Sequence, residues 1–131
     1  MTTIEKVLQR LAKYPAVSYR ATSSTITIDA QSSNGFTVFL EARKGTFTVA
    51  FDGWHEHFEA ESSALNCFAF GLIGKCRLKV CRSGKVEYRW TLEYPTNDGW
   101  QEDSTTGLIF FPFWRKRQIF YRQNPKIELD L

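Results

Sequence analysis

The side chains in this sequence whose types and spacing suggest chemistry are basic, and the chemistry they suit is the binding of anions. The stretch 75–92 carries six Lys and Arg residues against one acidic residue, Glu87, and the stretch 104–127 carries five and no acidic residue. Each stretch has a net charge of +5, whereas the whole chain of 131 residues has a formal net charge of +3. The other residues therefore sum to −7, and charge this unevenly distributed predicts a surface that meets an acidic partner.

Strand geometry aims several of these basic side chains in one direction. Lys75, Arg77 and Lys79 alternate along an expected strand, so they share one face. Arg89 on the next strand is expected opposite Arg77, and a folded protein tolerates two like charges side by side more easily when an anion or solvent lies over them. We therefore predict one binding patch, made of Lys75, Arg77, Lys79, Arg89, Arg115, Lys116, Arg117 and Arg122 together with Trp114. The alternative is that these residues form only the solvated face of a sheet.

The segment 110–125, FFPFWRKRQIFYRQNP, interleaves aromatic and basic residues. This pattern suits single-stranded nucleic acid, because rings stack on bases and cations pair with phosphates. It also suits an acidic protein, because Trp, Tyr and Arg are preferred interface anchors. A third interpretation places the phenylalanines Phe110, Phe111, Phe113 and Phe120 in the core and leaves 115–117 as a solvated turn. The run 108–114 is apolar on both faces, so we expect it either deep in the core or in a binding surface.

Histidine and cysteine residues give weaker signals. His55 and His57 would share one face of a strand and could reach one metal ion, but the sequence names no third ligand. The three cysteines, Cys67, Cys76 and Cys81, are an odd number and lack the spacing of a disulfide framework. We therefore expect no catalytic residues, no metal ion and no cofactor.

Membrane and export signals are also weak. The longest unbroken apolar run, 67–74, is far shorter than the ~20 residues of a membrane span. The first residues lack the pattern of a secretory signal. We expect no membrane partner and a cytoplasmic protein in a reducing environment.

Hydrophobic spacing predicts two helices. Apolar residues from Ile4 to Leu11 recur at helical spacing and predict an amphipathic helix over 3–13, begun by a capping box of Thr2 and Glu5. A broader apolar stripe predicts a second helix over 60–73, ended by Gly74.

Alternating apolar residues predict antiparallel strands before and after the second helix. The expected strands are near 25–30, 36–42, 47–51, 76–81, 86–92, 118–122 and 127–131. Lys44-Gly45 is expected to be a two-residue turn that pairs Leu40 with Val49. Three-residue loops with glycine at positive φ are expected at 33–35 and 82–84, and the second of these pairs Val80 with Val86. The segment 95–106 is expected to be a loop.

These expectations define an α+β fold over a single domain, residues 1–131. We expect one largely antiparallel, curved sheet of six to eight strands with both helices on one face, in the order α-βββ-α-ββββ. The function that fits is a non-catalytic binding module whose basic, aromatic-flanked sheet surface engages an acidic protein or nucleic acid. The alternative is a small-ligand-binding or enzymatic domain with an aromatic-lined cavity between sheet and helix.

Overall fold

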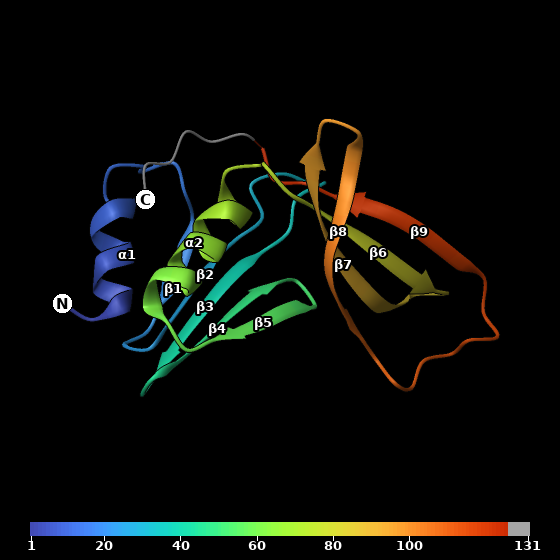
Figure 1. The fold of residues 1–131 in the computed structure, drawn as a ribbon, viewed down its shortest axis with the longest axis horizontal. Helices are drawn as coiled ribbons and strands as arrows, with labels where there is room; N and C mark the ends of the chain where they lie inside the picture. The colour runs from blue at the N-terminus through green and yellow to red at the C-terminus, as the bar shows by residue number, and fades with distance from the viewer. Residues whose placement is uncertain (126–131) are drawn as a thin grey trace.

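The computed structural model describes residues 1–125 and shows an α+β fold, as predicted. The helices are α1 (Thr3–Leu11) and α2 (Glu61–Leu72). The strands are β1 (Tyr19–Ala21), β2 (Thr25–Ile28), β3 (Val38–Arg43), β4 (Thr46–Phe51), β5 (Trp54–Phe58), β6 (Arg77–Ser83), β7 (Val86–Thr96), β8 (Gly99–Gly107) and β9 (Arg117–Arg122). They form two antiparallel sheets rather than one, with the orders β1-β2-β3-β4-β5 and β8-β7-β6-β9 (Figure 1). The strand expected at 127–131 lies outside the described residues.

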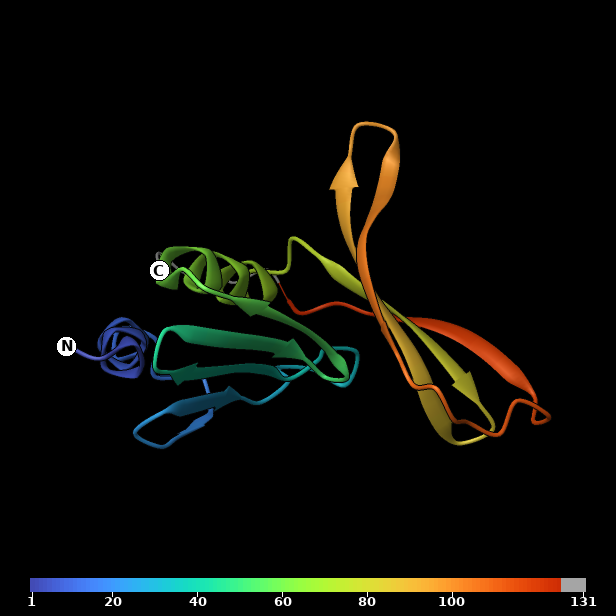
Figure 2. The same cartoon turned by 60° about the horizontal axis from the view of Figure 1, so that its bottom comes forward.

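The five-stranded sheet carries both helices on one face (Figures 1 and 2). Helix α1 begins with the predicted capping box, in which the Glu5 backbone N–H donates to Thr2 Oγ1 and the Thr2 N–H donates to the Glu5 carboxylate. Helix α2 ends before Gly74, which has a φ of 74° and so suits a residue without Cβ. Thr3 Oγ1 donates to Glu61 Oε2 over 2.7 Å and ties the two helix starts together.

One predicted hairpin register is confirmed and one loop is wrong. Strands β3 and β4 meet at the Lys44-Gly45 turn, so that Leu40 pairs with Val49. The connection between β2 and β3 is longer than three residues, because β2 ends at Ile28 and β3 begins only at Val38. Gly35 has no positive φ; instead, a Cβ there would lie 2.6 Å from Asn124 Oδ1, so the close approach of that side chain requires glycine.

The four-stranded sheet corrects two further expectations. Strands β6 and β7 turn at Gly84-Lys85, and an irregularity at Tyr88 shifts the register, so that Val80 pairs with Trp90 rather than Val86. Gly84 does have the expected positive φ, 58°. The segment expected to be a loop contains β8, a polar edge strand whose backbone pairs with β7 and whose side chains are mostly exposed.

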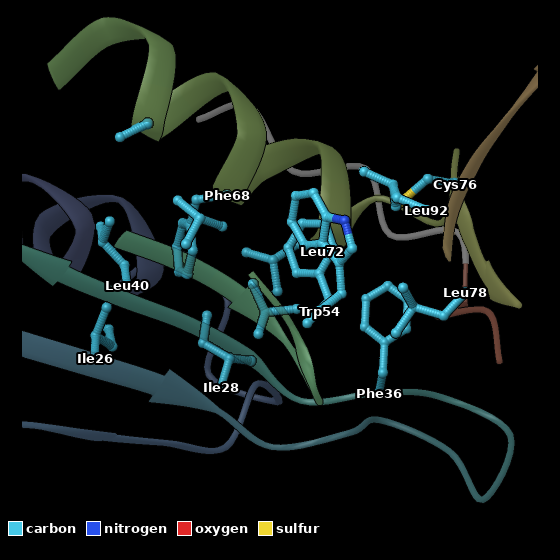
Figure 3. Close-up of a cluster of buried hydrophobic side chains, with 14 of the residues drawn as sticks. Ile26, Ile28, Phe36, Leu40, Trp54, Phe68, Leu72, Cys76, Leu78 and Leu92 are labelled. Carbon is cyan, nitrogen blue, oxygen red and sulfur yellow. The ribbon is translucent and has the colours of Figure 1, made fainter. Parts of the chain in front are cut away.

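A single apolar core joins the two sheets near α2. Figure 3 shows Phe68 and Leu72 of α2 above Trp54 of β5, with Leu78 and Leu92 of the second sheet beside them. The rest of the four-stranded sheet leads away from the helices, so the start of β9 lies at the end of the molecule opposite α1 (Figures 1 and 2).

Candidate functional site

Arg77, the centre of the predicted patch, is bound within the protein. Its Nε donates to Glu93 Oε1 over 2.7 Å, and its guanidinium lies between the rings of Trp100 and Tyr121, 4.2 and 4.1 Å from their centroids. The expected pairing of Arg77 with Arg89 is wrong, because the shifted register places Arg77 opposite Glu93. Arg77 therefore has its charge paired with Glu93 and its guanidinium packed against two aromatic rings.

Arg122 is also engaged, at the junction of the two sheets. Its guanidinium contacts Asp52 Oδ2 at 2.7 Å and Glu87 Oε1 at 2.9 Å, and Asp52 accepts hydrogen bonds from Thr37. The hydrogen bond from Arg122 lowers the pKa of Glu87 below its usual range, and the pKa of Arg122 is raised in return. This ion-pair group holds the sheets together and leaves Arg122 little capacity for an external anion.

The other predicted residues are spread along the four-stranded sheet, with Arg89 exposed on β7 opposite Cys81. Lys75 is exposed beside α2, and Lys79 Nζ lies 3.8 Å from Glu102 Oε1. Arg115, Lys116 and Arg117 are exposed at the far end of the sheet. Of the predicted residues, Arg77 and Arg122 are thus paired within the fold, whereas Arg115, Lys116 and Arg117 are exposed next to the exposed ring of Trp114.

We define the sheet tip as residues 84–86 and 108–117, which lie together at the far end of the four-stranded sheet. The Gly84 backbone N–H donates to the Lys116 carbonyl over 2.9 Å and joins the two segments. The sheet tip carries four basic residues and no acidic residue: Lys85, Arg115, Lys116 and Arg117. Lys85 was missed by the sequence prediction, because only the hairpin places it next to residues 30 positions later. Within residues 1–125, Lys85, Arg115 and Lys116 form no ion pair.

The apolar run 108–114 is at the surface, so the core interpretation of Phe110 and Phe113 is wrong. Ile109 is 88% exposed and Phe110 90% exposed, and Trp114 is 70% exposed. Leu108 and Phe113 are also exposed, whereas Phe111 and Phe120 are half-buried. This leaves five large apolar side chains in contact with solvent beside the four basic residues.

The protein holds this run in place. The ring of Phe111 stacks on Tyr88 with centroids 4.0 Å apart and planes within 5° of parallel. The hydroxyl of Ser83, which is fully buried, donates to the Pro112 carbonyl, and the Arg115 N–H donates to the same carbonyl over 3.0 Å. Residues 111 and 112 thus anchor the run, and the side chains on either side of them point outward. A groove of about 570 Å³ lies between Val86, Pro112, Trp114 and Arg115.

A second hollow lies between α2 and the two sheets. Its volume is about 420 Å³, and Phe58, Phe70 and Tyr94 line it with the carboxylates of Glu56 and Asp103. Burial, and to a lesser degree the charge of Asp103, raises the pKa of Glu56. Cys67 also lines this hollow, and burial raises the pKa of its thiol to about 12, so the nucleophilic thiolate is disfavoured.

The histidines lie on β5, on either side of Glu56, and line neither hollow. Their ring centroids are 5.5 Å apart, and His57 Nδ1 is 2.9 Å from Thr48 Oγ1. Among residues 1–125, no three His, Cys, Asp or Glu side chains are grouped so that they could hold a metal ion.

No family model, no curated protein and no solved structure matches this chain. Neither helix of the described residues has the length and apolar character needed to cross a membrane.

Proposed function

We propose that this chain is a non-catalytic binding module that engages an acidic partner through the sheet tip. The observation that carries the proposal is the juxtaposition of Ile109, Phe110 and Trp114, all at least 70% exposed, with four basic residues. Contiguous exposed apolar surface is unfavourable in water and typically marks a contact site. The basic residues give that contact a preference for negative charge.

The division of the basic residues supports this choice of surface. Arg77 and Arg122 stabilise the fold through Glu93, Asp52 and Glu87, so they are poor candidates for partner binding. Arg115 and Lys116 extend into solvent, where a partner can reach them. We also propose a cytoplasmic location, because the three cysteines are free in the structure and thiols persist in a reducing compartment.

Retention on immobilised heparin, a polyanion, tests the proposal. We expect wild type to be retained at low salt and released as salt rises, because polyanion binding releases counterions. Arg115→Glu with Lys116→Glu should elute at much lower salt. The matched control is Lys13→Glu with Lys44→Glu, which makes the same change in net charge at exposed positions on other elements. Equal loss of retention in the two variants would show that only net charge matters and would reject the sheet tip.

The hollow beside α2 favours a second candidate function, a small-ligand-binding domain. Its aromatic lining and its two carboxylates suit an apolar molecule that carries an amine. Such a ligand should raise the unfolding temperature of wild type but not of a Phe70→Ala variant, and salt should weaken the effect little. Screening apolar amines by thermal shift distinguishes this function from salt-sensitive binding at the sheet tip.

A further inference from the structure

We infer that the acidic partner is the surface of an anionic lipid bilayer, into which the apolar side chains of the sheet tip insert. This inference rests on the proposed function and names the chemistry of the partner. It concerns attachment to a membrane surface, which needs a few exposed apolar residues rather than a spanning segment. Attachment of this kind is compatible with the finding that neither described helix could cross a membrane.

The kind of apolar residue favours lipid over nucleic acid. Leu108 and Ile109 are aliphatic and exposed, and aliphatic side chains offer no π face for a base. Of the exposed rings, Phe113 and Trp114 pack edge to face, with centroids 5.4 Å apart and an interplanar angle of 84°, so they do not form a parallel platform. Acyl chains accept aliphatic and aromatic groups alike.

The shape of the surface favours lipid over a protein. Ile109 and Phe110 are the most exposed of the large apolar residues described, and they belong to the loop 108–116. This loop connects β8 to β9 at the end of the molecule opposite α1 (Figures 1 and 2). A protein partner would need a cavity shaped to this protrusion, whereas a bilayer deforms around any apolar shape. The loop is already held by Phe111 and Pro112, so insertion orders little additional backbone.

The basic residues and the position of Trp114 also suit the surface of an anionic bilayer. Lys85, Arg115 and Lys116 flank the apolar loop, and the chain has no acidic residue from 104 to 127. Basic residues next to inserted apolar side chains would meet the anionic head groups. Trp114 lies between the apolar residues and the basic ones in sequence, which suits the preference of tryptophan for the boundary of head groups and acyl chains.

Co-sedimentation with vesicles tests the inference. One set is phosphatidylcholine alone, and the other is an equal mixture of phosphatidylcholine and phosphatidylserine. We expect wild type to sediment with the mixed vesicles and much less with phosphatidylcholine. Ile109→Ser with Phe110→Ser should lower the partition coefficient roughly tenfold or more, because buried methylene groups supply much of the attraction. Both positions are almost fully exposed, so this variant should keep the wild-type fold.

The matched control replaces an exposed apolar residue elsewhere. Tyr19→Ser alters β1, away from the sheet tip, and should sediment like wild type. Arg115→Glu with Lys116→Glu should lose the preference for phosphatidylserine. Retention on heparin serves as the parallel measurement of the proposed function.

Each outcome separates the two proposals. Sedimentation with mixed vesicles that depends on both Ile109-Phe110 and Arg115-Lys116 supports the inference. Retention on heparin through the sheet tip without vesicle binding overturns the lipid inference and leaves nucleic acid or acidic protein as the partner. Vesicle binding that survives Ile109→Ser with Phe110→Ser also overturns it, because the contact is then purely electrostatic. Failure to bind either heparin or vesicles at low salt overturns the proposed function as well.

Discussion

The five-stranded sheet together with α1 and α2, which we call the helix-covered layer, contains the same kinds of residues as the sheet tip but in the opposite environment. In the layer, Trp54 is fully buried and Phe68 is 1% exposed, because α2, which carries Phe68, packs over the sheet next to Trp54. At the sheet tip, Phe110 is 90% exposed, because no described element covers the loop. Hydrophobic character alone therefore does not decide burial; a second layer must be available to pack against.

Basic residues show the same contrast. Arg122 is paired with Asp52 and Glu87 at the junction of the sheets, whereas Arg115 and Lys116, a few residues earlier in the chain, face solvent. A single basic stretch thus contains one residue that holds the fold together and others available to a partner. Charge counts along a sequence do not separate these roles.

The largest contrast should come from one substitution made in both regions. Phe68→Ala should lower the free energy of unfolding by ~3–5 kcal/mol, since it leaves a cavity in the core. Phe110→Ala should change it by less than ~0.5 kcal/mol, since the ring is already hydrated. Denaturant unfolding of both variants measures the difference. A loss of stability in Phe110→Ala close to that in Phe68→Ala would show that the loop packs inside the protein.

The ion pairs at the junction should give the next largest effect. Arg122→Met should lower the free energy of unfolding by about 2 kcal/mol, because it leaves two partly buried carboxylates without a cationic partner. The matched control is Arg20→Met, whose pair with Asp29 is exposed and should contribute less than ~0.5 kcal/mol.

The same pair predicts a dependence on pH. Because Arg122 lowers the pKa of Glu87 in the folded state, the stabilisation is present above the unfolded pKa of ~4.3 and is lost as pH falls through the lowered folded value. The difference in free energy of unfolding between wild type and Arg122→Met should therefore become smaller at acid pH. A deficit that stays constant across this range would exclude an electrostatic cause.

Local signals in the sequence predicted both helices and the strands β2, β3 and β4 of the helix-covered layer, but not β1 or β5. The capping box of Thr2 and Glu5 lies within four residues, and the Lys44-Gly45 turn fixes the β3–β4 register by its own chemistry. Each of these features needs only neighbouring residues, so the sequence displays it directly. The same holds for the alternation of apolar residues that chose which face of each strand is buried.

Features of the four-stranded sheet depend on distant residues and could not be predicted. The pair of Arg122 with Asp52 joins residues 70 positions apart. The register of β6 and β7 depends on the irregularity at Tyr88, whose ring packs on Phe111. Strand β8 lies at a sheet edge and is held by backbone hydrogen bonds to β7, so its side chains can be polar. Its sequence therefore lacks the apolar alternation that would predict a strand. The sequence did contain one signal for the sheet tip. Residues 108–114 are all apolar, without the alternation of apolar and polar residues that a half-buried strand shows.

The turns of the two sheets allow a smaller test of the comparison. Gly45→Val should lower the free energy of unfolding by ~1 kcal/mol, because φ is 74° there and a β-branched residue is strained at positive φ. No steric cost is added, since no atom lies within 4 Å of the new Cβ. Gly84→Val should cost more than Gly45→Val, because its φ is 58° and its Cβ would also lie 3.2 Å from Arg115 Cβ. The control is Gly107→Ala, which meets only the Tyr88 carbonyl at 3.6 Å and should be nearly silent. Thermal or denaturant unfolding ranks the three; equal effects at Gly45 and Gly84 would mean that the Arg115 contact adds nothing.

The smallest effect concerns the boundary of the two regions, where Glu56 lines the hollow beside α2. Burial raises the pKa of Glu56 in the folded state, so its charged form is less favourable there than in the unfolded chain. Glu56→Gln should therefore raise the free energy of unfolding at neutral pH. The gain should be only about 0.3 kcal/mol, because solvent still reaches the carboxyl group and screens its charge. The gain should disappear as pH falls below the unfolded pKa of ~4.3, where both proteins carry a neutral side chain. Unfolding measured at neutral and acid pH, with exposed Glu59→Gln as the control, resolves the sign. If Glu56→Gln destabilises the protein at neutral pH, the carboxylate stabilises the boundary instead, and the pKa of Glu56 must lie below its usual range.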